Sequence, residues 1–294
     1  MDHTAVRGVA RVIALAAVVW TVALGVHAQT VPVKIYAQEL VDRTVAQHPD
    51  LRAVVMHVTP PNATGNIVIA SSIGHIGNPA DTNDLDVLST GNTRVSIDQA
   101  KKRIEVELPL RDVGGAAVGA LGLVWRLPVG GSRAEFERNA VAIRDALSRR
   151  ILNLANLMEP YPYAPMVTTK SRAQTMVDEA LLRHPEVTVL ALRGRSHGEL
   201  VLLGSTFGRH GKKADADDAK VLESRAPNTG VYSKGTRFGV DLALHDRSGA
   251  AIGTMNVGYV YTGKEDTAAL TARAVALRDE LQARIDGSLD EVDP

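Results

Sequence analysis

The sequence of 294 residues contains an internal repeat, and this feature constrains the fold more than any other. Residues 37–50 match residues 173–186 at an offset of 136, and from residue 71 onward the matching offset is 134. The change of two residues falls at a predicted hairpin loop, where length variation is tolerated. Because a repeat of this length corresponds to a whole domain, the sequence predicts two copies of one module. The matched pairs include Ser71 with Ser205, Gly74 with Gly208, Gly77 with Gly211, Asp81 with Asp215, Asp84 with Asp218, and Arg103 with Arg237.

Each copy shows the same predicted order of secondary structure. Apolar residues at helical spacing predict an opening helix, which ends at His48-Pro49 or His184-Pro185 because proline disfavours the α conformation in the residue before it. Two strands, a glycine-containing loop, a short acidic helix outside the sheet, three more strands and a long amphipathic helix follow. The expected strands span 53–58, 67–71, 93–97, 103–111 and 117–126 in the first copy, and 188–192, 200–205, 230–233, 237–245 and 251–261 in the second; the short helices span 80–89 and 214–223.

This order predicts an α/β fold of the α+β type. Each module is expected to hold a central antiparallel sheet flanked by an N-terminal and a C-terminal helix. In the first closing helix, Ser132 with Glu135 predicts a capping box, and Asp266 predicts an N-cap for the second. The sequences at Asp112 and Asp246 are typical of tight turns between strands. The boundaries that follow are 29–157 for the first module, 158–166 for a proline-rich linker, and 167–294 for the second module.

Residues 1–28 have the composition of a secretory signal peptide. Arg7 and Arg11 precede an apolar run at 12–26, and the segment ends at Ala28 in an Ala-x-Ala-like cleavage sequence. The run is shorter than the roughly 20 residues that a helix needs to cross a bilayer. We therefore expect cleavage after Ala28 and a periplasmic or secreted protein, the alternative being an uncleaved helix that anchors the chain in the inner membrane.

Charge and cysteine content exclude several kinds of function. Without residues 1–28 the chain holds one more acidic than basic residue, so nucleic acid is not an expected partner. The sequence has no cysteine, which excludes disulfides, thiolate chemistry and cysteine-ligated zinc. The modules must therefore be stabilised by packed cores.

The order of elements resembles that of PAS-like extracytoplasmic sensor domains of the Cache type, in tandem. The paired strand-turn-strand segments carry the resemblance, at 108–121 in the first copy and around Asp246 and Gly253 in the second. The resemblance implies capture of a small ligand between the sheet and the loop-plus-helix segment, here 73–89 and 207–223. Members of that group usually sit between membrane helices ahead of a signalling domain, and this chain shows no second membrane segment. We therefore expect any signal to pass through a partner, such as a membrane or envelope protein.

The glycine loop and its neighbouring charges are the candidate ligand site, and two interpretations remain open. The glycines could let backbone N–H groups approach a ligand while Asp81 and Asp215 orient it; alternatively, the glycines supply positive φ and the aspartates cap the short helices. Arg103 and Arg237 could bind a carboxylate or form cross-strand pairs, which we favour. The candidate residues are Ser71, Gly74, His75, Gly77, Asp81, Asp84 and Arg103 in the first copy, and Ser205, Gly208, His210, Gly211, Asp215, Asp218 and Arg237 in the second.

No catalytic motif, metal motif or cofactor motif is found, so we predict no catalytic residues, no metal and no cofactor. The favoured function is a non-catalytic small-molecule-binding or sensor-accessory protein, which predicts matched pockets in both copies. A structural or adaptor protein of the cell envelope is the alternative, and it predicts an exposed apolar patch instead. A hydrolase or a haem or metal handler is the third hypothesis. It requires His57, His75 or His210 to converge with acidic residues in one copy only.

Overall fold

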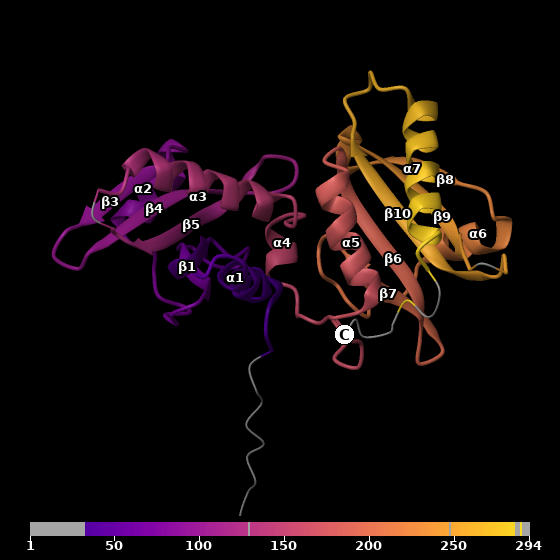
Figure 1. Ribbon diagram of the computed structural model, residues 1–294, viewed down its shortest axis with the longest axis horizontal. Helices are drawn as coiled ribbons and strands as arrows, with labels where there is room; N and C mark the ends of the chain where they lie inside the picture. Colours follow the sequence, from indigo (N-terminus) through magenta and orange to yellow (C-terminus); the bar gives the residue numbers. More distant parts are fainter. Residues whose placement is uncertain (1–32, 129, 247, 286–288, 290–294) are drawn as a thin grey trace, which may run out of the picture. The chain divides into compact units, whose positions relative to one another are not determined.

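The computed structural model describes residues 33–128, 130–246, 248–285 and 289, and it confirms two modules of one fold (Figure 1). The predicted signal peptide at residues 1–28 lies outside this range. The first module contains α1 (Tyr36–Gln47), β1 (Leu51–Val58), β2 (Ile67–Ser71), α2 (Thr82–Thr90), β3 (Arg94–Asp98), β4 (Arg103–Arg111), β5 (Ala117–Arg126), α3 (Arg133–Ser148) and α4 (Leu154–Leu157). The second contains α5 (Arg172–Arg183), β6 (Val187–Ser196), β7 (Glu199–Ser205), α6 (Ala216–Ser224), β8 (Asn228–Tyr232), the 3-10 helix η1 (Ser233–Gly235), β9 (Arg237–His245), β10 (Ala251–Val260) and α7 (Thr267–Gln282).

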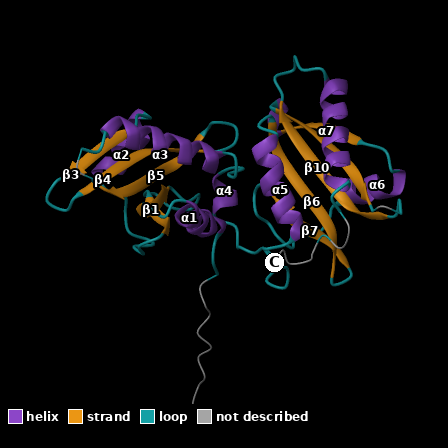
Figure 2. Cartoon of the chain, viewed as in Figure 1, coloured by secondary structure: helices purple, strands orange, loops and turns teal. Residues whose placement is uncertain are grey.

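Each module is built on one antiparallel sheet with the same strand order. The order is β2-β1-β5-β4-β3 in the first module and β7-β6-β10-β9-β8 in the second. Figure 2 shows the strands and helices of both modules. In each, the first and last strands of the chain order, β1 with β5 and β6 with β10, pair at the centre. This confirms the predicted fold class. No helix among the described residues is long and apolar enough to cross a membrane.

The two faces of each sheet carry different side chains, because successive residues of a strand point to opposite faces. In β4, Ile104, Val106 and Leu108 lie in the buried cluster that α1 and α3 cover. Glu105 and Glu107 lie on the other face, where α2 packs against β4 and β5. Helix α2 therefore lies outside the sheet, as the sequence predicted, and covers part of one of its faces. The second module repeats the arrangement with α5, α7 and α6.

Local sequence explains where most helices begin and end. His48 and His184 are the C-caps of α1 and α5, as the His-Pro pairs predicted. Asp266 caps α7 through the N–H groups of residues 268 and 269. The predicted capping box at Ser132 is wrong: its side chain makes no cap bond, because the Glu135 N–H donates to the Ser132 carbonyl at 3.0 Å instead.

One strand extends further than its polar sequence suggested. We expected a loop at residues 193–198, but β6 continues to Ser196 and β7 begins at Glu199. Only His197 and Gly198 form the turn, with φ of 51° and 83°. Two residues with positive φ form the tight hairpin turn that matches the twist of paired strands.

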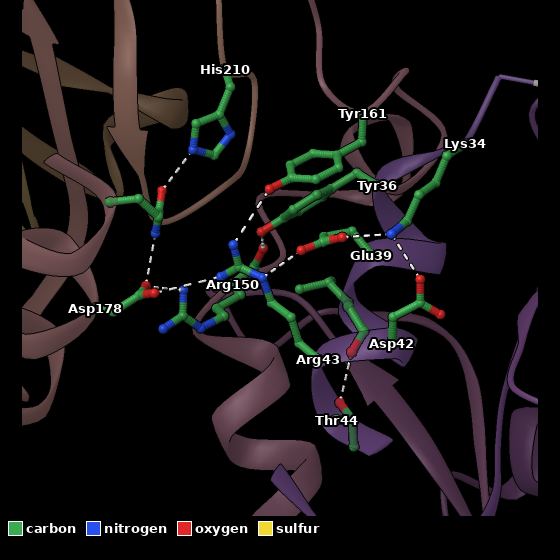
Figure 3. A network of polar contacts seen from close by, with 12 residues as sticks. Lys34, Tyr36, Glu39, Asp42, Arg43, Thr44, Arg150, Tyr161, Asp178 and His210 are labelled. Atoms are coloured by element: carbon green, nitrogen blue, oxygen red, sulfur yellow. Dashed lines mark hydrogen bonds and ion pairs between the residues drawn. The ribbon is translucent and has the colours of Figure 1, made fainter. Parts of the chain in front are cut away.

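Polar contacts join residues of the two modules (Figure 3). The Tyr36 hydroxyl lies 3.1 Å from the Thr206 carbonyl, and the Arg150 guanidinium lies 2.8 Å from Asp178. In the predicted linker, Tyr161 is only 5% exposed and belongs to the apolar cluster of the first module. The N–H of Ala164 donates to the His210 carbonyl at 2.9 Å. The segment between the modules is thus packed against both of them.

Candidate functional site

Each module has a pocket at the same place, between the short helix and the sheet face that the other helices leave uncovered. The first-module pocket has a volume of about 210 Å³ and lies between α2 and strands β1, β4 and β5. The second-module pocket has a volume of about 240 Å³ and lies between α6 and strands β6, β9 and β10. Matched positions of the repeat line both, namely Asp81, Asp84, Glu107 and Gly122 in the first module and Asp215, Asp218, Asp241 and Asn256 in the second.

The aspartates at the start of the short helices also have a structural role. Asp81 Oδ1 accepts hydrogen bonds from the N–H groups of Asn83 and Asp84, at 2.7 and 3.1 Å. In turn, the Asp84 carboxylate accepts a hydrogen bond from the Asp81 N–H at 3.1 Å, which completes a capping box. Asp215 and Asp218 make the same box in the second module. The helix-cap interpretation is therefore confirmed, and the same carboxylates also line the pockets.

In the second module, neighbouring side chains stabilise the buried carboxylates. Arg193 Nε lies 3.0 Å from Asp218 Oδ2 as an ion pair without hydrogen-bond alignment, and the Thr254 hydroxyl donates to Asp218 Oδ1 at 2.7 Å. The amide of Asn256 donates to Asp241 at 2.5 Å. A second amide, from Asn228, donates to the other oxygen of Asp241 at 3.1 Å.

In the first module, every one of these donors is replaced. Ala120 stands at the position of Thr254, and Gly122 at the position of Asn256. Arg94 stands where the second module has Asn228, and it lies 3.3 Å from Asp86 instead. His57 takes the place of Arg193, because these two residues pair with Ala120 and Thr254 across the strands.

The first-module carboxylates are consequently under-compensated. His57 Nδ1 lies 3.4 Å from Asp84 Oδ2, without a hydrogen bond. The Oε2 atom of Glu107 is buried and has no hydrogen-bond partner among the described residues. Burial, followed by repulsion from Glu105, raises the pKa of Glu107 to about 8. Burial also raises the pKa of Asp84 and lowers that of His57, so both shift toward their neutral forms.

About half of the predicted site residues lie at these pockets. Ser71, His75, Asp81 and Asp84 line the first pocket, and Asp215, Asp218 and Arg237 line the second. The others do not. Gly74 and Gly77 provide positive φ in the loop. Arg103 lies opposite Asp98 across two strands and 3.9 Å from its carboxylate, as the cross-strand interpretation predicted.

The second glycine loop contacts the first module instead of the pocket. A Cβ on Gly208 would lie 2.7 Å from the Tyr36 ring, and the region around Gly211 contacts Ala164. The His210 ring donates from Nε2 to Gln174 at 2.9 Å. Ser205 donates its N–H to the same glutamine oxygen at 2.9 Å.

Of the sheet residues that complete the pockets, the sequence singled out only His57, as a candidate of the metal-handling hypothesis. The residues that it did not single out are Glu105 and Glu107 in the first module, and Arg193, Tyr232, Asp241 and Asn256 in the second. One feature of the sequence could have identified two of them. Glu105 and Glu107 alternate with apolar residues along one strand, so both side chains point to the same face of the sheet. The apolar residues between them point to the other face.

No protein-family model matches the chain, and no curated protein matches it. Among solved structures, the chain is similar to PelD from Pseudomonas aeruginosa, with 18% identity and a TM-score of 0.28 over 84% of this chain and 76% of that one. It is also similar to the E. coli DhaR(N)-DhaL complex, with 10% identity and a TM-score of 0.25 over 77% and 85% of the two chains. An IclR-family transcriptional regulator domain matches over 41% of this chain and 98% of its own, with 13% identity and a TM-score of 0.28.

These similarities are low, so the classification rests on the strand order and the position of the pockets. A five-stranded antiparallel sheet of this order, with long helices on one face and a pocket under a short helix on the other, is PAS-like. Each of the two modules thus has a PAS-like arrangement of strands and a pocket beneath its short helix.

Proposed function

We propose that the protein is an exported, non-catalytic small-molecule-binding protein of the Cache type, acting as a sensor accessory in the bacterial periplasm. The observation that carries the proposal is the pair of pockets at matched places, lined by matched carboxylates. Retention of a pocket in both copies is what a ligand-binding module requires. A protein that serves only as a scaffold would gain stability by filling these spaces.

The second-module pocket has the chemistry of a site for a small organic cation. The ring of Tyr232 lies against Gly230 and Gly239, where an added Cβ would come within 2.9 and 2.7 Å of it. The ring therefore forms an aromatic wall that any larger residue would displace. Asp217 lines the same pocket and makes no helix-cap bond through its carboxylate, so its charge is available to an ammonium group. Arg237, also at this pocket, can meet a carboxylate at the other end of the ligand.

The test is a thermal-shift screen of the purified protein against amino acids, polyamines, simple amines and organic acids. Binding stabilises the folded state by about 2.7 kcal/mol at a hundredfold excess over the dissociation constant. We expect stabilisation by amines or amino acids. The hits are then titrated against Asp217→Asn and Tyr232→Ala, each of which should weaken binding by roughly tenfold, or about 1.4 kcal/mol.

Two features make these variants informative. Asp217→Asn places in the second module the residue that the first already has at this position, Asn83, so the fold is expected to tolerate it. Glu223→Gln removes the same charge from the exposed face of α6, outside the pocket, and should leave binding unchanged. No stabilisation by any compound, or equal effects of the Asp217 and Glu223 variants, would count against a ligand site here.

The adaptor alternative is favoured by one observation in the first glycine loop. Ile73 and Ile76 are 54% and 57% exposed, whereas Phe207 and His210 at the matched positions are 4% and 1% exposed. An envelope protein could cover the first loop as the first module covers the second. Replacing both isoleucines with serine should then abolish co-purification of a membrane-fraction partner while leaving ligand-induced stabilisation intact.

A further inference from the structure

The first-module pocket brings together more carboxyl groups than its basic side chains pair with. Asp81, Asp84, Glu105 and Glu107 line it; Arg103 lies 3.7 Å from Glu105, and His57 lies 3.4 Å from Asp84. Glu107 is 4% exposed and its Oε2 atom has no partner among the described residues, while His57 is 8% exposed with an unpartnered Nδ1. A buried carboxyl group without a hydrogen-bond partner is destabilising when ionised, and a bound cation would compensate its charge.

The second module has carboxylates at the same positions, but there they have side-chain partners. Its matched carboxylates are Asp218, which has an ion pair and a hydroxyl donor, and Asp241, which has two amide donors. The first module has different residues at all four partner positions but still has carboxyl groups at the matched positions, with glutamate in place of aspartate at position 107. The carboxyl groups of the first module therefore lack the side-chain partners that their counterparts in the second module have.

The geometry of the cluster matches one small ion. One carboxylate oxygen each from Asp81, Asp84 and Glu107 lies within 4.8 Å of the others. Metal-bound oxygens lie about 2.0–2.6 Å from a divalent cation, so ligands on opposite sides of one ion are separated by about 4–5 Å. The helix cap uses only Oδ1 of Asp81, which leaves that carboxylate able to contribute its second oxygen.

We infer that the first-module pocket binds a divalent metal ion through the carboxylates of Asp81, Asp84 and Glu107, with the imidazole of His57 beside it. This meets the condition that the sequence set for a metal-handling protein, a histidine converging with acidic residues in one copy only. Carboxylate oxygens suit Mg²⁺, Ca²⁺ and Mn²⁺, and an added imidazole nitrogen favours Mn²⁺ or Zn²⁺. The site is separate from the second-module pocket, so the inference does not depend on the ligand proposed there.

The test is titration of the EDTA-treated full chain with Mn²⁺, followed by calorimetry and by the electron paramagnetic resonance of free Mn²⁺, with Mg²⁺, Ca²⁺ and Zn²⁺ as competitors. We expect one Mn²⁺ per chain and a raised melting temperature. Glu107→Gln should weaken Mn²⁺ binding by at least tenfold without unfolding the protein, because it removes one metal ligand whose buried oxygen makes no hydrogen bond to the rest of the described chain. The matched variant in the second module, Asp241→Asn, should leave the stoichiometry at one.

A second variant tests the site without removing any carboxylate. Ala120→Thr with Gly122→Asn installs two donors of the second module beside Asp84 and Glu107; an added Cβ at position 122 meets no atom closer than 3.9 Å. We expect this variant to keep its fold and lose Mn²⁺ binding. Absence of binding by all four metals, or Mn²⁺ binding unchanged in Glu107→Gln, overturns the inference. Stabilisation by amines that is lost in Glu107→Gln, with no metal bound, would assign the pocket to an organic cation instead. Asp217→Asn should not affect Mn²⁺, which separates this result from failure of the proposed function.

Discussion

The glutamine at the start of each opening helix makes the same contact in both modules, but only the glutamine of the second module also forms a hydrogen bond with a histidine. Gln38 accepts the N–H of Ser71 at 3.0 Å, and Gln174 accepts the N–H of Ser205 at 2.9 Å. Gln174 also accepts from His210, which is nearly fully buried. The matching residue of the first module is the exposed Ile76. Residues at equivalent positions thus acquired different electrostatic properties after duplication.

His210 should make the stability of the protein depend on pH. Burial lowers the pKa of His210 to about 4 from an ordinary value of 6.5, and the charge of Arg43 opposes protonation while Glu39 and Asp178 favour it. The unfolded chain therefore binds a proton that the folded chain does not, and stability falls as pH drops from about 6.5 to about 4. The expected contribution is up to about 1.4 kcal/mol per pH unit.

Denaturant unfolding of the wild type and of His210→Gln at several pH values measures this contribution. Glutamine keeps an N–H donor for Gln174 but does not titrate, so its stability should decline less over the same range. Parallel curves for the two proteins would show that His210 contributes nothing to the pH dependence.

At the scale of elements, the second module brings its opening helix closer to the sheet than the first. A Cβ on Gly204 of β7 would overlap the carbonyl of Ala173 in α5 and lie 2.8 Å from the Gln174 nitrogen. The first module has Ala70 at the matched position, so the same contact does not exist there. Glycine at position 204 is required by helix–sheet distance and not by backbone conformation.

Gly204→Ala should destabilise the protein by about 1–3 kcal/mol, the range for overpacking a buried site. The helix cannot retreat easily because its backbone, and not a flexible side chain, is in contact. Gly65→Ala is the control, since no atom lies within 4 Å of its added Cβ and it is exposed. Chemical denaturation compares the two, and equal midpoints would contradict the proposed close approach.

Much of this element order was predictable, because hydrophobic periodicity and turn residues are local properties. Strands β4, β5 and β9 have the predicted bounds. The short helix α4 was missed because four residues carry too little periodicity. The pockets were only partly predictable: Asp81 and Asp84 are visible in the repeat, whereas the proximity of His57 to Asp84 depends on how α2 packs over a sheet.

At the scale of the whole molecule, Arg149 connects the modules by capping a helix that belongs to the other one. Its guanidinium donates to the carbonyls of Leu181 at 2.8 Å and of His184 and Val187 at 3.3 Å. These are carbonyls at and beyond the C-terminal end of α5, which lack partners within the helix. The matched residue of the second module is Ala283, so the arginine is not needed for the fold of a module. Its hydrogen bonds connect the two modules.

Arg149→Ala should lower the stability of the second module by about 1–2 kcal/mol, since it removes hydrogen bonds from a charged donor. We expect calorimetry to show the second module unfolding at a lower temperature than in the wild type. Arg138→Ala, an exposed arginine on the same helix, provides the control. Identical thermograms for the two variants would mean that the cap adds no stability.

The predicted export of the protein concerns the whole chain and can be tested directly. If residues 1–28 are a cleaved signal peptide, protein recovered from the periplasm should begin at Gln29 by N-terminal sequencing. Recovery in the membrane fraction with an intact N-terminus would support the anchored alternative, and retention in the cytoplasm would exclude both.

The different surroundings of the two glycine loops have a kinetic consequence. His75 and Asn78 of the first loop form part of a pocket wall and face solvent, and loops of this kind rearrange within nanoseconds to microseconds. The second loop is held by an ion pair from Arg209 to Glu159 at 2.6 Å and by the Asn156 amide on the Phe207 carbonyl at 3.0 Å. The loop that forms part of the first pocket wall can therefore move on this time scale, whereas movement of the second loop must first break its contacts with Glu159 and Asn156. We therefore expect two copies of one loop sequence to differ in mobility, the first moving freely in solvent and the second moving only when its contacts break.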